Sequence, residues 1–227
     1  MADGSAIAIT ARHHPRARRW KLRYDGVRDL LHLTMPPRAN AKAGLLWAGE
    51  QAIWIAAQRA KNHGVKPVEH GSVLPFVDGT LTIDWAEGRA RRVEWAGDML
   101  RVGGPRAGLA RRVEKWLRAA AIECLTSETM ALAASAGLAC HDVSIGDPRS
   151  RWGSCSARGT IRYNWRLIMA PVAVRRAIVA HEVAHLRHMH HGADFHALVG
   201  ELADGTDAAA YRWLKTHGRE LHRWQFS

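Results

Sequence analysis

The chain has 227 residues, of which 47% are hydrophobic and 24% are charged, proportions typical of a globular protein. No apolar run reaches the length that a bilayer requires, which excludes a membrane-spanning protein. The formal net charge of +12 favours polyanions and makes nucleic acid a candidate partner. The basic residues are dispersed and no dense recognition motif accompanies them, so a solvated surface is the commoner interpretation.

The cysteines and the N-terminus indicate the cytoplasm. The three cysteines, Cys124, Cys140 and Cys155, are odd in number and lack framework spacing, which fits a reducing compartment. Near the N-terminus a short apolar stretch precedes its positive charges, the wrong order for a secretory signal. We therefore expect a cytoplasmic protein, and the sequence gives no indication of its oligomeric state.

The first part of the chain, residues 1–105, is predicted to be rich in strands with one helix. Residues 1–35 suggest a strand pair that turns at Asp25-Gly26, and the helix is expected over 41–61. Short strands then follow within residues 72–103, in VLPFV, TLTIDW, RRVEW and MLRV. Turn pairs such as Asp-Gly and Glu-Gly separate these strands.

The second part, residues 106–227, is predicted to be mainly helical. A long helix is expected over 107–136, although the pattern leaves its continuity past Thr126 open. Strands follow in VSIGD and GTIRYNWRLI, and helices in ADFHALVGELA and DAAAYRWLKTHGRELHRW. Together the two parts predict an α+β protein.

A histidine-rich segment, HEVAHLRHMHH over residues 181–191, is the most informative part of the sequence. His181 and His185 are four residues apart, so on a helix they lie on one face and can bind the same metal ion. Glu182 follows the first histidine and is placed to act as general base toward a metal-activated water. This HExxH pattern is typical of zinc peptidases.

The residues around the motif favour a helix. Apolar residues at helical spacing precede it, Pro171 suits a first helical turn and Gly192 suits its end, so a helix is predicted over about 171–189. The chain contains 14 histidines, so the alternative is an ordinary helix that matches the pattern by chance.

A catalytic zinc site usually has a third protein ligand and an open fourth position. His188, His190, His191 and His196 all follow closely enough to be candidates. His188 would lie a turn further along the helix axis, too far to complete a tetrahedron easily. A residue just past the helix end can fold back toward the metal, which favours His191, with His190 and His196 as alternatives.

Two segments resemble the YgjP-like metallopeptidase family, bacterial zincins related to the SprT-like and Wss1-like proteases. These segments are RWGSCSARGTIRYNWRLIMAP, residues 151–171, and HEVAHLRHMHHGADFHALV, residues 181–199. The positions that carry the likeness are Trp152-Gly153-Ser154-Cys155, Asn164-Trp165-Arg166-Leu167, His181, Glu182, His185, His191 and Phe195. The resemblance implies a zincin-like second part, Zn²⁺ as cofactor and His191 as third ligand. It extends over most of residues 10–225, which implies one continuous domain.

Two positions depart from the family's pattern. Gly192 stands where Ser is usual, which can loosen the loop that holds His191. His196 stands where Trp is usual, which leaves an additional candidate ligand near the metal. Cys155 is either a fourth ligand that holds the site inactive or, more commonly, a buried small residue.

Substrate contacts are predicted from the strand over residues 160–168. In zincins an edge strand beside the metal helix commonly pairs with the peptide, although an ordinary half-buried strand would have the same pattern. The candidate substrate-binding residues are Trp152, Tyr163, Asn164 and His196. The candidate oxyanion donors are Tyr163, Arg149, Arg151 and His196. Asp194 is a candidate for orienting a ligand imidazole.

The sequence therefore predicts a zinc-dependent metallopeptidase that hydrolyses peptide bonds in a peptide or protein substrate. One alternative is a DNA-associated protease that removes proteins crosslinked to DNA. A second is a non-enzymatic, zinc-stabilised module that binds nucleic acid or protein, although a structural zinc site has no need of Glu182. A third is a metal-dependent hydrolase of a non-peptide amide.

Overall fold

The computed structural model describes residues 6–26, 28–60 and 64–226. Contacts between residues divide the chain into two compact units, Met1–Val65 and Lys66–Ser227. The boundary expected at residue 105 lies inside the second unit, because the strands between residues 73 and 102 contact elements of the C-terminal part.

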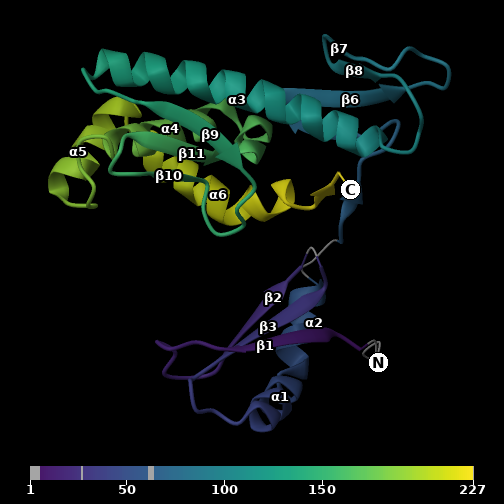
Figure 1. Cartoon of the computed structure of the whole chain (residues 1–227), viewed down its shortest axis with the longest axis vertical. Helices are drawn as coiled ribbons and strands as arrows, with labels where there is room; N and C mark the ends of the chain where they lie inside the picture. Colours follow the sequence, from purple (N-terminus) through teal and green to yellow (C-terminus); the bar gives the residue numbers. More distant parts are fainter. Residues whose placement is uncertain (1–5, 27, 61–63, 227) are drawn as a thin grey trace. The chain divides into compact units, whose positions relative to one another are not determined.

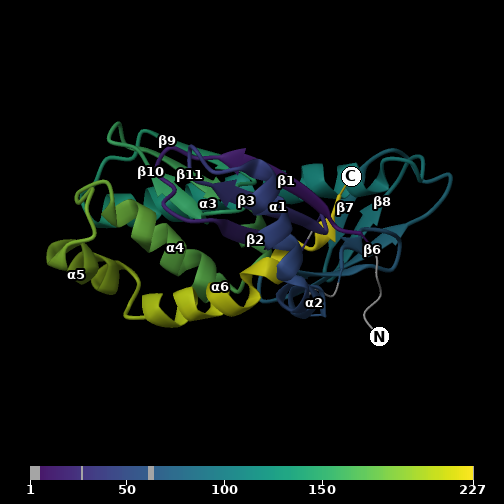
Figure 2. The ribbon, with the colours of Figure 1, turned by 90° about the horizontal axis from the view of Figure 1, so that it is seen from below.

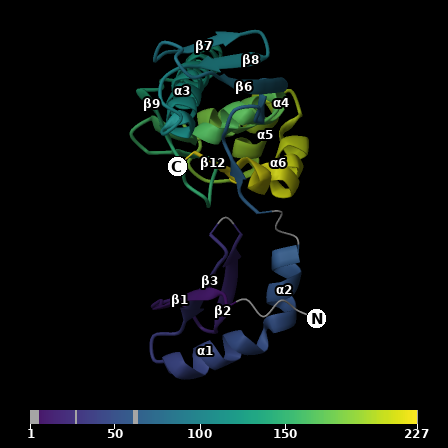
Figure 3. The same ribbon diagram turned by 90° about the vertical axis from the view of Figure 1, so that its right-hand side faces the viewer.

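The first unit is a three-stranded sheet with two helices (Figure 3). Its elements are β1 (Ala8–His13), β2 (Lys21–Asp25), β3 (Leu30–Met35), α1 (Ala41–Glu50) and α2 (Ala52–Ala60). The central strand β3 is parallel to β1 and antiparallel to β2. The predicted strand pair therefore omitted a strand, and the single helix predicted over 41–61 is two helices separated at Gln51. Residues 1–5, 27 and 61 of these predictions lie outside the described residues.

The core of the first unit lies between β3 and α1. Leu31, Leu33 and Met35 alternate along β3 and are buried. Gly44 lets α1 approach them closely, since a Cβ at this position would lie 2.7 Å from the Met35 sulfur.

The four strands that the sequence predicted form the first sheet of the second unit. They are β5 (Val73–Phe76), β6 (Gly79–Trp85), β7 (Val93–Ala96) and β8 (Met99–Val102). Their order in the sheet is β5-β6-β8-β7, with β6 parallel to β8. The short β4 (Lys66–Pro67) pairs with β12 (Trp224–Gln225), which ties the start of this unit to its end.

The long helix α3 (Leu109–Ser135) connects the two larger sheets of the second unit (Figure 1). Every fourth residue from Leu109 to Ala133 is buried, and the helix contacts β7 and β8 as well as β9 and α4. α3 is continuous past Thr126. The buried Thr129 does not interrupt it, because its hydroxyl is hydrogen-bonded to the Tyr163 hydroxyl at 3.0 Å.

The second sheet of this unit lies beside α3 (Figure 1). Its strands are β9 (Asp142–Gly146), β10 (Gly153–Cys155) and β11 (Thr160–Asn164), in the order β10-β11-β9. The strand predicted over 160–168 ends at Asn164, because a 3-10 helix (Trp165–Met169) follows and the Asn164 side chain accepts the Arg166 N–H at its start. β11 is the central strand, so the edge strand beside α4 is β10.

Three helices complete the second unit (Figure 2). They are α4 (Val172–Ala184), α5 (Ala193–Leu202) and α6 (Asp207–Leu221), and α4 contacts both of the others. α4 ends before the predicted residue 189, because a tight turn follows in which the N–H groups of Arg187 and His188 bond to the Ala184 carbonyl. Gly192 begins α5 and does not end α4.

The structure confirms the predicted α+β class, since its helices pack on several small sheets. None of the helices in the described part of the chain is long and apolar enough to cross a membrane.

Candidate metal centre

The helix α4 is anchored at its start and along its length. Asp78, in the turn between β5 and β6, accepts the N–H of Val172 at 2.7 Å and satisfies one of the free donors at the helix N-terminus. Arg175 is almost fully buried and forms two hydrogen bonds of 2.9 Å with Glu128 of α3. Such a bidentate pair fixes α4 against α3 more specifically than a single contact would.

Three imidazoles meet at the end of α4. His181 lies in its last turn, His185 follows its last residue, and His191 returns from the loop before α5. One nitrogen of each ring lies within 4.8 Å of those of the others, an arrangement that could hold a metal ion. Nε2 of His181 and Nε2 of His191 are 3.4 Å apart. The structure thus brings together the two motif histidines and the favoured third ligand, whereas His188, His190 and His196 lie outside this cluster.

The outer nitrogens of two of these rings have partners of their own. Nδ1 of His185 is hydrogen-bonded to the His188 carbonyl at 2.9 Å. Nδ1 of His181 is hydrogen-bonded to the hydroxyl of Tyr211 on α6. With both Nδ1 atoms occupied, the two Nε2 atoms are the ones left to bind a metal. No local sequence pattern indicated Tyr211, because it lies 30 residues from His181.

Phe195 forms the apolar wall of the cluster. It is buried, and its ring centroid lies 4.9 Å from His181, 4.5 Å from His185 and 4.8 Å from His191. Burial, followed by the neighbouring His185 and His191, lowers the pKa of His181 to about 4. Burial is also the main cause that lowers the pKa of His185. The rings of His181 and His185 are therefore neutral near pH 7, the form in which an imidazole binds a metal.

Glu182 is held under the strand β10. Its carboxyl is packed so closely on Gly153 that a Cβ at that glycine would lie 2.4 Å from Oε1. Its Oε2 is buried and has no hydrogen-bond partner among the residues that the structure describes. Burial raises the pKa of Glu182 to about 7, with Arg151 opposing the shift. A buried acid with an unpaired oxygen and a pKa near neutrality suits proton transfer.

Two of the predicted substrate contacts have other roles in the structure. Tyr163 is fully buried and its hydroxyl is paired with Thr129, so it is inaccessible both to a substrate and to an oxyanion. Asn164 is also fully buried, and its side chain donates to the Pro148 carbonyl while accepting from Arg166. Alternation along the strand did not reveal this burial, because both faces of β11 are covered at these positions.

The other residues predicted to bind substrate, to stabilise an oxyanion or to orient a ligand differ in their exposure to solvent. Trp152 is half-buried against α6, where a Cβ at Gly218 would lie 2.7 Å from its ring. His196 is exposed, with its ring centroid 6.4 Å from that of His191. Arg151 is exposed and Asp194 lies in the first turn of α5, also exposed.

Cys155 does not join the histidine cluster. Burial, together with the charge of Glu182, raises its thiol pKa to about 11. The thiol therefore stays protonated near neutral pH, whereas a metal ligand would be a thiolate. This supports the structural alternative for Cys155.

The donor set and its spacing fit a zinc ion. Two nitrogens bound at about 2.0–2.1 Å to a tetrahedral zinc are about 3.4 Å apart, the distance that separates the Nε2 atoms of His181 and His191. Three imidazoles with one side open are the ligand pattern of a catalytic zinc site.

The three histidines lie at the end of α4, beside a small sheet, and could hold a metal ion. The chain matches the family described as YgjP-like, metallopeptidase domain, over residues 18–217, and it belongs to this family. The resemblance indicated by the sequence motifs is thereby confirmed, and the protein is a metallopeptidase by family. The match spans parts of both units. Comparisons with curated proteins and with solved structures gave no match.

Proposed function

We propose that the chain is a zinc-dependent peptidase in which His181, His185 and His191 hold the metal through Nε2. The observation that carries this proposal is the convergence of three imidazoles beside one buried acid. Imidazole nitrogens suit zinc, whereas magnesium and calcium take oxygen ligands. The chemistry that zinc supplies in such a site is Lewis acidity toward a substrate carbonyl and toward water.

Glu182 is the proposed general base. Its raised pKa of about 7 makes the carboxylate a better proton acceptor than an exposed glutamate. Oε2 has no partner among the described residues, so it is free to accept a proton from water and deliver it to the leaving amine. Gly153 keeps the carboxyl in place, because the absence of a side chain there leaves room only for the glutamate.

Two contacts orient the metal-binding rings. The Nδ1–H of His185 donates to the His188 carbonyl, and the Nδ1–H of His181 donates to the Tyr211 oxygen. Each hydrogen bond fixes the tautomer that presents Nε2 to the metal and limits rotation of the ring. Tyr211 thus acts as a positioning residue for His181.

The substrate peptide is expected to pair with β10. This strand lies at the edge of its sheet and contacts α4, so its outer main-chain groups can add a further strand next to the histidines. Arg151 lies just before β10, and its charge partly opposes the raised pKa of Glu182. Arg151 and His196 are candidate donors to the oxyanion.

A peptidase assay with a fluorescence-quenched peptide library tests the proposal. Cleavage should require zinc, stop on chelation and return when zinc is added back. The Glu182→Gln variant should bind zinc normally and lose turnover, because Gln cannot accept the proton. Turnover at the wild-type rate in this variant would exclude Glu182 as the base. If the zinc site were purely structural, the protein would cleave no peptide. Such a site would also have no need of a buried, unpaired carboxyl beside it.

A further inference from the structure

The positive charge of the chain is concentrated in its first unit. Residues 1–65 contain 11 Lys or Arg and four Asp or Glu, so they contribute +7 of the net +12. Within the unit the charge is segregated as well, because residues 4–24 and 30–49 contain no acidic residue at all. A protein surface with one sign of charge over two adjoining segments attracts polyanions.

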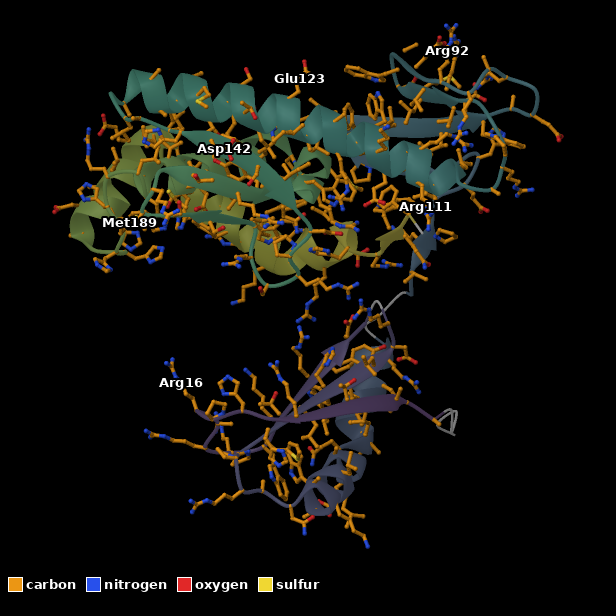
Figure 4. All side chains as sticks on the ribbon, viewed as in Figure 1. Arg16, Arg92, Arg111, Glu123, Asp142 and Met189 are labelled. Atoms are coloured by element: carbon orange, nitrogen blue, oxygen red, sulfur yellow. The ribbon has the colours of Figure 1, made fainter. Side chains whose placement is uncertain are left out.

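The fold gathers these segments at one end of the sheet, here called the basic end. It comprises the end of β1, the loop to β2, the start of β2 and the loop from β3 to α1. Its exposed cations are Arg12, Arg16, Arg18, Arg19, Lys21 and Arg38. Figure 4 shows Arg16 extending outward from the loop between β1 and β2. Among the described residues, none of the six forms an ion pair with a carboxylate.

Strand register and one hydrogen bond bring these cations together. Arg12 of β1 and Lys21 of β2 both lie opposite Thr34 of β3, on the same face of the sheet. Their Cα atoms are therefore about 10 Å apart, twice the spacing of adjacent strands. The His13 ring donates to the Ala39 carbonyl at 3.0 Å, which holds the loop of Arg38 against the end of β1.

The basic end also contains two tryptophans. Trp20 and Trp47 are half-buried, with ring centroids 5.5 Å apart. With Pro36, Arg18 and Arg19 they line an open pocket of about 450 Å³. Proteins commonly bind single-stranded nucleic acid through aromatic rings flanked by arginines. The bases stack on the rings and the phosphates contact the cations.

We propose that the basic end binds single-stranded nucleic acid, with a base in the Trp20–Trp47 pocket. A single strand fits better than a duplex, because the bases of a duplex are stacked on each other and cannot enter the pocket. An anionic membrane would engage the cations but has no planar group for the pocket. This inference does not depend on the proposed peptidase function, since its residues belong to the other unit.

Fluorescence anisotropy of the full-length protein with labelled oligothymidylate of about 20 nucleotides tests the inference. Each neutralised phosphate contributes about −0.7 to the slope of log affinity against log salt, so six engaged cations predict a slope of about −4. The double variant Arg18→Glu with Arg19→Glu should reduce this slope and weaken binding at least about tenfold. The matched control, Arg91→Glu with Arg92→Glu, changes the net charge equally at an exposed site of the second unit and should bind as the wild type does.

Variants of Trp47 test the pocket separately. Trp47→Leu should weaken binding about tenfold through lost stacking, while Trp47→Phe should retain most of the affinity. Circular dichroism shows whether each variant folds. If Trp47→Leu does not fold, the comparison of the two charge-reversal pairs tests the inference. The inference is overturned by equal weakening in both charge-reversal pairs, or by wild-type affinity in Trp47→Leu. Tighter binding to a duplex of the same length, or to vesicles containing phosphatidylglycerol, would overturn it as well.

Discussion

The hydroxyl of Tyr211 is hydrogen-bonded to Nδ1 of His181, which joins α6 to the metal-binding end of α4. This contact orients one proposed ligand from a helix that supplies no ligand itself. α6 and α4 also pack along each other, so the position of Tyr211 depends on the same contacts that build the core. The metal centre is therefore set by the assembled second unit and not by the histidine-rich segment alone.

Removing the Tyr211 hydroxyl should weaken metal binding. Tyr211→Phe keeps the ring but leaves Nδ1 of His181 without its partner, and the loss of such a contact typically reduces metal affinity about 10–100-fold. Competition with a chromogenic zinc chelator measures the affinity. Tyr24→Phe removes a tyrosine hydroxyl in the first unit and serves as the control. Equal affinities of Tyr211→Phe and wild type would remove Tyr211 from the site.

A methyl group at Gly153 should displace the proposed base. Gly153→Ala would place a Cβ 2.4 Å from Oε1 of Glu182, so the carboxyl must move. We expect turnover to fall at least about tenfold while zinc content stays near one per chain, since misplacement by about 1 Å can cost 100-fold. The matched control is Gly192→Ala, next to His191, where a Cβ meets nothing within 4 Å and φ is −84°. Unchanged activity in Gly153→Ala would contradict the assigned position of the base.

The buried carboxyl of Glu182 should destabilise the metal-free protein at neutral and higher pH. Its pKa is raised on folding from 4.5 to about 7. The folded chain therefore holds this proton more tightly, and the resulting stability is lost as the pH rises through this range. In the metal-free chain Glu182→Gln should raise the free energy of unfolding at pH 8 by up to about 3 kcal/mol, and change it little at pH 4.5.

Urea unfolding at the two pH values measures this difference. Glu201→Gln, at an exposed position of α5, is the control for removing a negative charge. A stabilisation by Glu182→Gln that is the same at both pH values would show that the pKa of Glu182 is not raised. The residue best suited to proton transfer is thus expected to destabilise the metal-free fold at neutral pH.

The start of α4 should depend on Asp78. Asp78→Ala removes the acceptor of the Val172 N–H and places alanine at a φ of 60°, so the melting temperature should fall by an amount equivalent to about 1–2 kcal/mol. Asp78→Asn keeps an acceptor oxygen and tolerates this backbone conformation, so it should lose much less. Zinc affinity should be unchanged in both variants, because the histidines lie at the other end of the helix. Equal melting temperatures for Asp78→Ala and wild type would contradict the capping role.

Local patterns predicted the parts of the site that are close in sequence. The spacing of His181 and His185 predicted two neighbouring imidazoles, and the position of His191 after the helix favoured it as the third over His190 and His196. These three rings are the ones that cluster in the structure. The four strands of the first sheet in the second unit were also predicted from their turn signals.

Long-range packing decided the features that the sequence did not reveal. Strand order makes β10 and not β11 the edge strand, and no periodicity encodes this order. Tyr163 was a candidate substrate contact on an alternating strand, but its hydroxyl is hydrogen-bonded to Thr129 of α3. Tyr211 had no local signal, because its contact with His181 exists only after α6 packs on α4.

The metal content of the native protein and of His191→Ala tests the central claim most directly. Elemental mass spectrometry should find about one zinc per chain in the native protein and a sharp reduction in His191→Ala. His196→Ala is the control, since its ring lies outside the cluster of three, and it should retain zinc. Full zinc retention in His191→Ala, or no metal in folded native protein even after zinc is added, would contradict the proposed site.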